Sequence, residues 1–94
     1  MTIIYLLYYI EYRMELQLLK KIIKYRSIHS GTKETDILYE RYFIKNLEKF
    51  NEIELNLLIS VFNIHSDNEI YQILTKKIKP NQKFKRLFDK INKI

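Results

Sequence analysis

The feature of this 94-residue sequence that most limits its fold is a shortage of chain-turning residues, with one glycine, Gly31, and one proline, Pro80. Tight hairpin turns depend on glycine at backbone positions with positive φ, and no stretch alternates between apolar and polar residues with flanking turn pairs. Helices are therefore favoured over sheets. The length allows one domain, and 47% hydrophobic with 30% charged residues predicts a folded chain.

Apolar side chains recur at helical spacing through most of the sequence, which predicts an all-α fold: a small compact bundle of about five short helices. The first is expected from about Glu15 to Ile28. The others are expected to start after Thr32, after Asn51, after Ser66 and near Asn81, and the fourth to end before Pro80.

Local sequence signals mark several of these helix starts. Asn51 with Glu54, and Ser66 with Glu69, have the spacing of capping boxes. The second helix is expected to be largely buried, because it carries a broad apolar face formed by Ile37, Leu38, Phe43, Ile44 and Leu47.

Residues 1–13 are interpreted as an N-terminal extension or arm in front of a helical domain at residues 14–94. Residues 2–10 are an apolar run of nine, less than half of the roughly 20 that a membrane helix needs, and the segment lacks the basic start and cleavage site of a signal peptide. Neither stable membrane insertion nor export is expected. Two alternatives remain: translation starts at Met14, or the segment forms a strand-like or helical arm that covers the bundle.

Residues that carry out common catalytic chemistry are scarce. The chain has no cysteine and two histidines, His29 and His65, so no metal site is predicted, and the lack of cysteine fits a reducing cytoplasm. A phosphate-binding loop needs more than one glycine, and neither histidine lies in a Ser/His/Asp pattern. The acids Glu52 and Glu54 are explained by helix capping. We therefore expect that the protein is not an enzyme.

Charge is unevenly distributed along the chain. The net charge is +6 overall, with about +4 over residues 1–33, −5 over residues 34–69 and +7 over residues 70–94. Two interaction classes stay open from this pattern and from the second apolar faces of the helices. One is a nucleic-acid binder that uses the bases of the last helix, and the other is an oligomerising helical module. The bases are Lys83, Lys85, Arg86, Lys90 and Lys93.

Polar and charged residues gather at the junction between the first two helices, around Gly31. Such a cluster on a connection between rigid elements indicates a recognition surface, while a C-cap glycine followed by ordinary first-turn acids explains it about as well. Gly31 itself is expected to have a positive φ or to approach another surface closely. The candidate partner-binding residues are Arg26, His29, Ser30, Gly31, Lys33, Glu34 and Asp36.

The segment Tyr25-Arg26-Ser27, followed by Gly31-x-x-Glu34-x-Asp36-Ile37-Leu38, resembles the YRS-x-x-RG-x-x-E-x-D-LL signature of the FAD assembly factors of succinate dehydrogenase. That family is called SdhE in bacteria and succinate dehydrogenase assembly factor 2 in mitochondria. The resemblance covers about Lys21 to Lys79 and extends through both capping boxes. It departs from the signature at Ser30, where the family has arginine.

The resemblance implies an all-α assembly factor in the bacterial cytoplasm, a monomer when free, that binds no nucleic acid. Its partner would be the flavoprotein subunit of succinate dehydrogenase, or of fumarate reductase, and it would promote covalent attachment of FAD to a histidine of that subunit. It would hold no cofactor tightly and act on the FAD of its partner. Gly31 would permit close backbone approach, Glu34 would accept hydrogen bonds, Arg26 would pair with an acid or brace the loop, and Asp36 would fix the start of the second helix.

Overall fold

The computed structural model describes the backbone of residues 2–94 and the side chains of Leu6 and residues 14–94. Five α-helices and two 3₁₀ helices make up the described chain, without a strand. The predicted all-α class is thereby confirmed. The elements are α1 (Thr2–Ile28), α2 (Lys33–Tyr42), η1 (Ile44–Lys49), α3 (Glu52–Ile64), α4 (Asp67–Leu74), η2 (Gln82–Phe84) and α5 (Lys85–Asn92).

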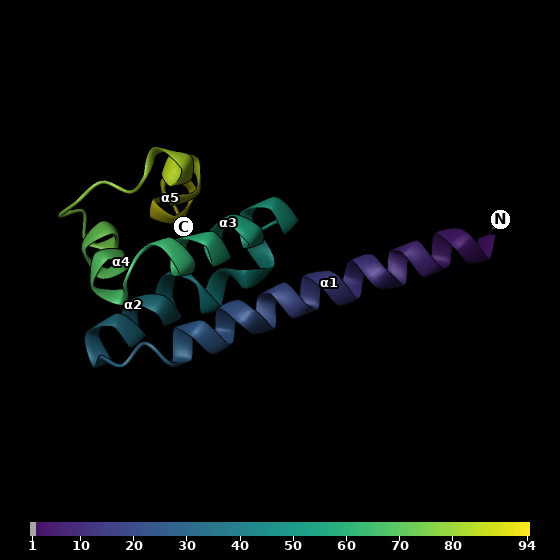
Figure 1. Cartoon of the computed structure of the whole chain (residues 1–94), viewed down its shortest axis with the longest axis horizontal. Coiled ribbons are helices and arrows are strands. Elements are labelled where there is room, and N and C mark those ends of the chain that lie inside the picture. The colour runs from purple at the N-terminus through teal and green to yellow at the C-terminus, as the bar shows by residue number, and fades with distance from the viewer. Residues whose placement is uncertain (1) are drawn as a thin grey trace.

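The helices are arranged in layers around α3 (Figure 1). The helix α1 packs against α2, η1 and α3, while α4 contacts α2 and α3, and α5 contacts α3 from the other side. The molecule measures 52 × 26 × 23 Å. Its long dimension comes from α1, whose N-terminal half projects beyond the other helices (Figure 1).

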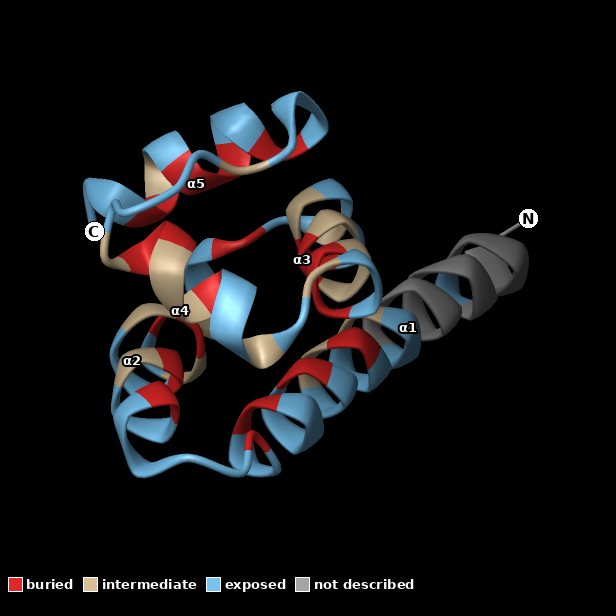
Figure 2. Cartoon of the chain, turned by 60° about the vertical axis from the view of Figure 1, so that its left-hand side comes forward, coloured by how far each residue is buried: buried red, intermediate tan, exposed pale blue. Residues whose placement is uncertain are grey.

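The buried residues lie on the inward faces of the helices (Figure 2). Three aromatic rings occupy the contact between α2 and α3: the ring of Phe43 lies 5.2 Å from that of Tyr39 and 5.6 Å from that of Phe62, and all three are almost completely buried. Ring pairs at such separations are favourable beyond the area that they bury. Packing of aromatic and aliphatic side chains therefore holds the layers together.

Both capping boxes form as predicted. Asn51 and Glu54 exchange two hydrogen bonds at the start of α3, and Ser66 and Glu69 do the same at the start of α4. Partial burial alone would raise the pKa of Glu54. The backbone N–H of Asn51 and the ammonium of Lys90, 2.8 Å away, outweigh that burial and hold its pKa below the ordinary value.

The second helix is shorter and less buried than expected. It ends at Tyr42, and only Thr35 and Tyr39 of its residues are buried. The side-chain amide of Asn46 donates to the carbonyls of Arg41 and Tyr42, which replaces the next helical turn. The five residues expected to share one face therefore do not, and Ile37 is 60% exposed.

The fourth helix also ends earlier than Pro80 requires. It stops at Leu74, and Lys76 adopts a φ of +63°, in a position that usually holds glycine. The N–H of Lys77 then donates to the carbonyl of Gln72 over 2.8 Å. This arrangement ends the helix without a glycine, which is why the sequence did not reveal it.

The backbone of residues 2–13 is helical and forms the first part of α1, which has no break at residues 13 and 14. Met1 lies outside the described residues. A translation start at Met14 stays a prediction. Among the described residues, no helix combines the length and hydrophobicity needed to cross a membrane.

Candidate docking site at the α1–α2 junction

The connection between α1 and α2 turns at Gly31, which has a φ of +85°, one of the two alternatives expected from the sequence. A Cβ atom built there would meet no other atom within 4 Å. The glycine is therefore explained by backbone conformation rather than by close packing within the chain. Its outer side is open, and the turn is exposed between the two helices (Figure 2).

Four of the seven candidate residues lie on the outside of this turn. His29, Gly31, Lys33 and Glu34 are all exposed, and we call them the junction edge. The ring of His29 packs against that of Tyr25, with centroids 4.4 Å apart. The junction edge thus presents an imidazole, a bare backbone segment, an ammonium and a carboxylate to the surroundings.

Ser30 lies on the inside of the turn. Its side chain is 7% exposed, and its hydroxyl donates a hydrogen bond to the carboxylate of Asp36. Thr32 caps α2 by accepting from the N–H of Thr35 over 3.3 Å. Ser30 and Asp36 therefore bind each other and fix the start of α2. Ser30, at the position where the family signature has arginine, is part of the turn's internal structure.

Arg26 braces the opposite side of the turn. Its guanidinium donates to the carbonyl of Phe62 over 2.7 Å and to the side-chain oxygen of Asn63 over 3.1 Å, and it lies 5.5 Å from the centre of the Phe62 ring. A cation beside the last carbonyls of α3 also matches the negative end of that helix. These contacts fit the bracing role implied for Arg26, and its pairing with an acid of a partner stays a prediction.

We expect Arg26→Ala to lower the free energy of unfolding by about 1.5–3 kcal/mol, because hydrogen bonds to a charged group are lost and the carbonyl of Phe62 is left without this donor. Thermal unfolding followed by circular dichroism measures the effect. Lys24→Ala, which removes an exposed cation from the same helix, is the matched control and should change the midpoint little. Equal midpoints for the two variants would contradict the bracing role.

A hollow of about 300 Å³ lies beside Glu34, between the first turns of α2 and α4. The hydroxyl of Tyr39 donates to the carboxylate of Asp67 over 2.7 Å and ties the two helices together. Burial, and then the hydrogen bond and negative charge of Asp67, raise the pKa of Tyr39 far above its ordinary value, so the phenol stays a donor. The residues around the hollow are Thr32, Glu34, Thr35, Asp67, Asn68 and Tyr71.

The sequence did not identify the α4 side of this hollow. The capping box at Ser66 placed Asp67 in a first helical turn, but no local signal indicated that this turn lies beside Glu34. Among the described side chains, no group of three or more histidines or acids is arranged to bind a metal.

The bases that suggested a nucleic-acid surface lie at the far side of the molecule, on and near α5. Four of them are exposed. The fifth, Lys90, binds Glu54 at 2.8 Å and also donates to the carbonyl of Lys49, so it contributes to the contact between α5 and α3.

A family model described as Sdh5, flavinator of succinate dehydrogenase, matches residues 21–94. The chain belongs to this family. The match contains all seven candidate site residues and every helix from α2 to α5, and it confirms the family expected from the sequence. It begins inside α1, so the projecting half of that helix lies outside it. No curated protein and no solved structure gives a significant match.

Proposed function

We propose that this protein binds the flavoprotein subunit of succinate dehydrogenase through the junction edge and promotes covalent attachment of FAD to that subunit. The observation that carries the proposal is the family match, whose description names succinate dehydrogenase and the flavinator role. The exposed, preformed turn at Gly31 supports the choice of surface.

The role proposed for the protein is positioning. Covalent attachment joins the flavin to a histidine of the subunit itself, so this protein supplies no nucleophile and holds no cofactor tightly. Docking would restrict the subunit to arrangements in which flavin and histidine are close, which converts an infrequent encounter into a favoured one. The protein is thus an assembly factor and not an enzyme.

Each residue of the junction edge has a distinct role in this proposal. The backbone at Gly31 allows the subunit to approach, because no side chain lies between them. The carboxylate of Glu34 accepts hydrogen bonds from an arginine or backbone donors of the subunit, with the hollow beside it to receive a side chain. His29 and Lys33 add donors on either side. Arg26, Ser30 and Asp36 act indirectly, by holding the turn in shape.

Co-expression with a succinate dehydrogenase flavoprotein subunit tests the proposal, with in-gel fluorescence of the denatured subunit as the measure of covalent flavin. We expect this protein to raise the signal clearly above the level without it. Glu34→Ala should lower the apparent affinity for the subunit roughly tenfold or more, as expected for a lost charge-assisted hydrogen bond, and reduce the flavin signal at limiting expression.

The matched control is Glu40→Ala, which removes an exposed carboxylate from the same helix outside the junction edge. It should behave as the wild type. If the wild-type protein leaves covalent flavin unchanged, the function is wrong. If Glu34→Ala and Glu40→Ala both act as the wild type, the function stands and the docking surface is wrong.

A further inference from the structure

The long helix α1 has a second apolar face that the other described helices leave exposed, and His29 contacts it only at the ring of Tyr25. Its inner face carries the buried residues Leu19, Ile23 and Ser27. On the opposite side, four large apolar side chains are between 55% and 67% exposed. We call them the outer stripe: Met14, Leu18, Tyr25 and Ile28.

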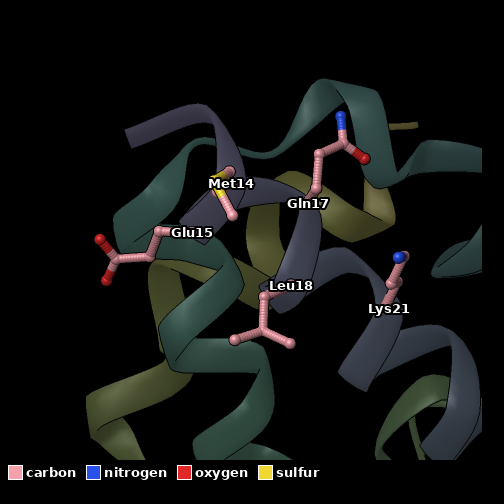
Figure 3. Close-up of a pocket in the computed structure, with 5 residues that line it drawn as sticks. All are labelled: Met14, Glu15, Gln17, Leu18 and Lys21. Carbon is pink, nitrogen blue, oxygen red and sulfur yellow. The ribbon is translucent and has the colours of Figure 1, made fainter. Parts of the chain in front are cut away.

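A hollow runs along the first part of the outer stripe, and all the residues that line it belong to α1. Figure 3 shows Met14 and Leu18 one above the other, with Glu15 on one side and Gln17 and Lys21 on the other. The hollow is therefore an uncovered strip of helix surface and not a space between elements. Four exposed large apolar side chains along one face of a helix indicate an interaction surface.

The spacing of the outer stripe specifies the kind of partner. Positions 14, 18, 21, 25 and 28 alternate steps of four and three residues, and the same steps continue through the sequence to positions 11, 7 and 4. An apolar repeat with this seven-residue period is the seam of a coiled coil, in which the helix faces another helix. Six of these eight seam positions are apolar, and the two exceptions are Glu11 and Lys21.

We propose that α1 pairs antiparallel with α1 of a second copy of this chain. In an antiparallel pair centred on residue 16, position 11 of one copy lies opposite position 21 of the other. The two exceptions in the seam, an acid and a base, thus occupy facing register positions twice in the pair. The apolar positions meet as well: 14 faces 18, 7 faces 25, and 4 faces 28. A parallel pair would instead place Glu11 beside Glu11 and Lys21 beside Lys21.

The shape of the molecule suits this arrangement. Helices α2 to α5 lie on the inner side of α1, and its N-terminal half projects beyond them (Figure 1). In the pair, the projecting half of each copy would lie along the outer stripe of the other, over a seam of about 36 Å. The two bundles would sit at opposite ends. This interface lies mostly outside the residues that the family model matches, and it departs from the monomer expected from the sequence.

Sedimentation equilibrium of the full chain tests the pairing. We expect a mass of twice 11.6 kDa at about 100 µM. Leu18→Glu should sediment as a monomer with an unchanged fold, because Leu18 is 57% exposed in the single chain. The matched control, Ile53→Glu, makes the same kind of change at a side chain of α3 that is 72% exposed, and it should remain a dimer.

Charge exchange tests the orientation. Glu11→Lys and Lys21→Glu should each weaken the dimer roughly tenfold or more, because each places like charges together at two points. The double variant Glu11→Lys/Lys21→Glu should recover the wild-type affinity. A double variant no tighter than either single one would overturn the antiparallel register.

Two further outcomes would overturn the proposal as a whole. One is a wild-type chain that is monomeric at about 100 µM. The other is a monomer that co-sediments with phosphatidylserine vesicles through Leu18, since the outer stripe would then bind a membrane surface. Neither result depends on flavinylation, so the pairing and the proposed function can fail separately.

Discussion

Gly31→Arg is expected to abolish most of the stimulation of covalent flavinylation while the protein stays folded. In the free chain the new Cβ atom would meet nothing within 4 Å and points into open space, so the main cost is that of the positive φ, about 1–2 kcal/mol. In the complex, the arginine would stand between the Gly31 backbone and the docked subunit. The measurements are in-gel flavin fluorescence after co-expression and thermal unfolding of the purified variant.

Two further variants distinguish the effect of backbone strain at residue 31 from the effect of the size of the arginine side chain. Gly31→Asn introduces a residue that tolerates positive φ. Its unfolding midpoint should be close to that of the wild type, and it should retain more of the stimulation of flavinylation than Gly31→Arg does. Asn92→Arg adds an arginine at an exposed position at the end of α5 and should retain full stimulation. Full stimulation by Gly31→Arg would show that the subunit does not approach this turn.

Phe43→Ala is expected to lower the stability of the fold more than any other variant considered. Phe43 is completely buried and its ring packs against those of Tyr39 and Phe62, so its truncation should cost about 3–5 kcal/mol. That is a large part of the total stability of a small domain, which is about 5–15 kcal/mol. Thermal unfolding followed by circular dichroism should show a midpoint at least about 12 °C lower, at roughly 4–8 °C per kcal/mol.

The control for this prediction is Ile37→Ala. Sequence periodicity placed Ile37 and Phe43 on one buried face, whereas the structure leaves Ile37 60% exposed. Its truncation should therefore change the free energy of unfolding by no more than about 0.5 kcal/mol. Similar losses from the two variants would mean that α2 packs in the way that the sequence suggested.

What the sequence could predict here depended on signals close together along the chain. The capping boxes at Asn51 and Ser66 depend on residues three apart, and both form. The only glycine in the sequence, Gly31, marked a position with a positive φ or a close approach, and the structure has the positive φ. Local spacing also suffices for the core side of α1, where Leu19 and Ile23 are buried. These features need no knowledge of what lies across the fold.

The features that sequence reasoning missed depend on contacts between distant segments or on unusual helix ends. Arg26 and the carbonyl of Phe62 are 36 residues apart, and Tyr39 and Asp67 are 28 apart, so periodicity cannot pair them. The end of α2 depends on the Asn46 amide, and that of α4 on a lysine with positive φ. A helix can end at a side-chain hydrogen bond or at a lysine with positive φ, and a search for glycine and proline does not find such helix ends.

The two helices that flank Gly31 are both held in place. Arg26 of α1 binds the end of α3, and Tyr39 of α2 binds Asp67 of α4. A surface held in this way gives up little conformational entropy when it is occupied. In the proposed docking, conformational adjustment would then fall mainly on the flavoprotein subunit. The small protein would then act as a rigid binding surface, and the conformational change would occur in its partner.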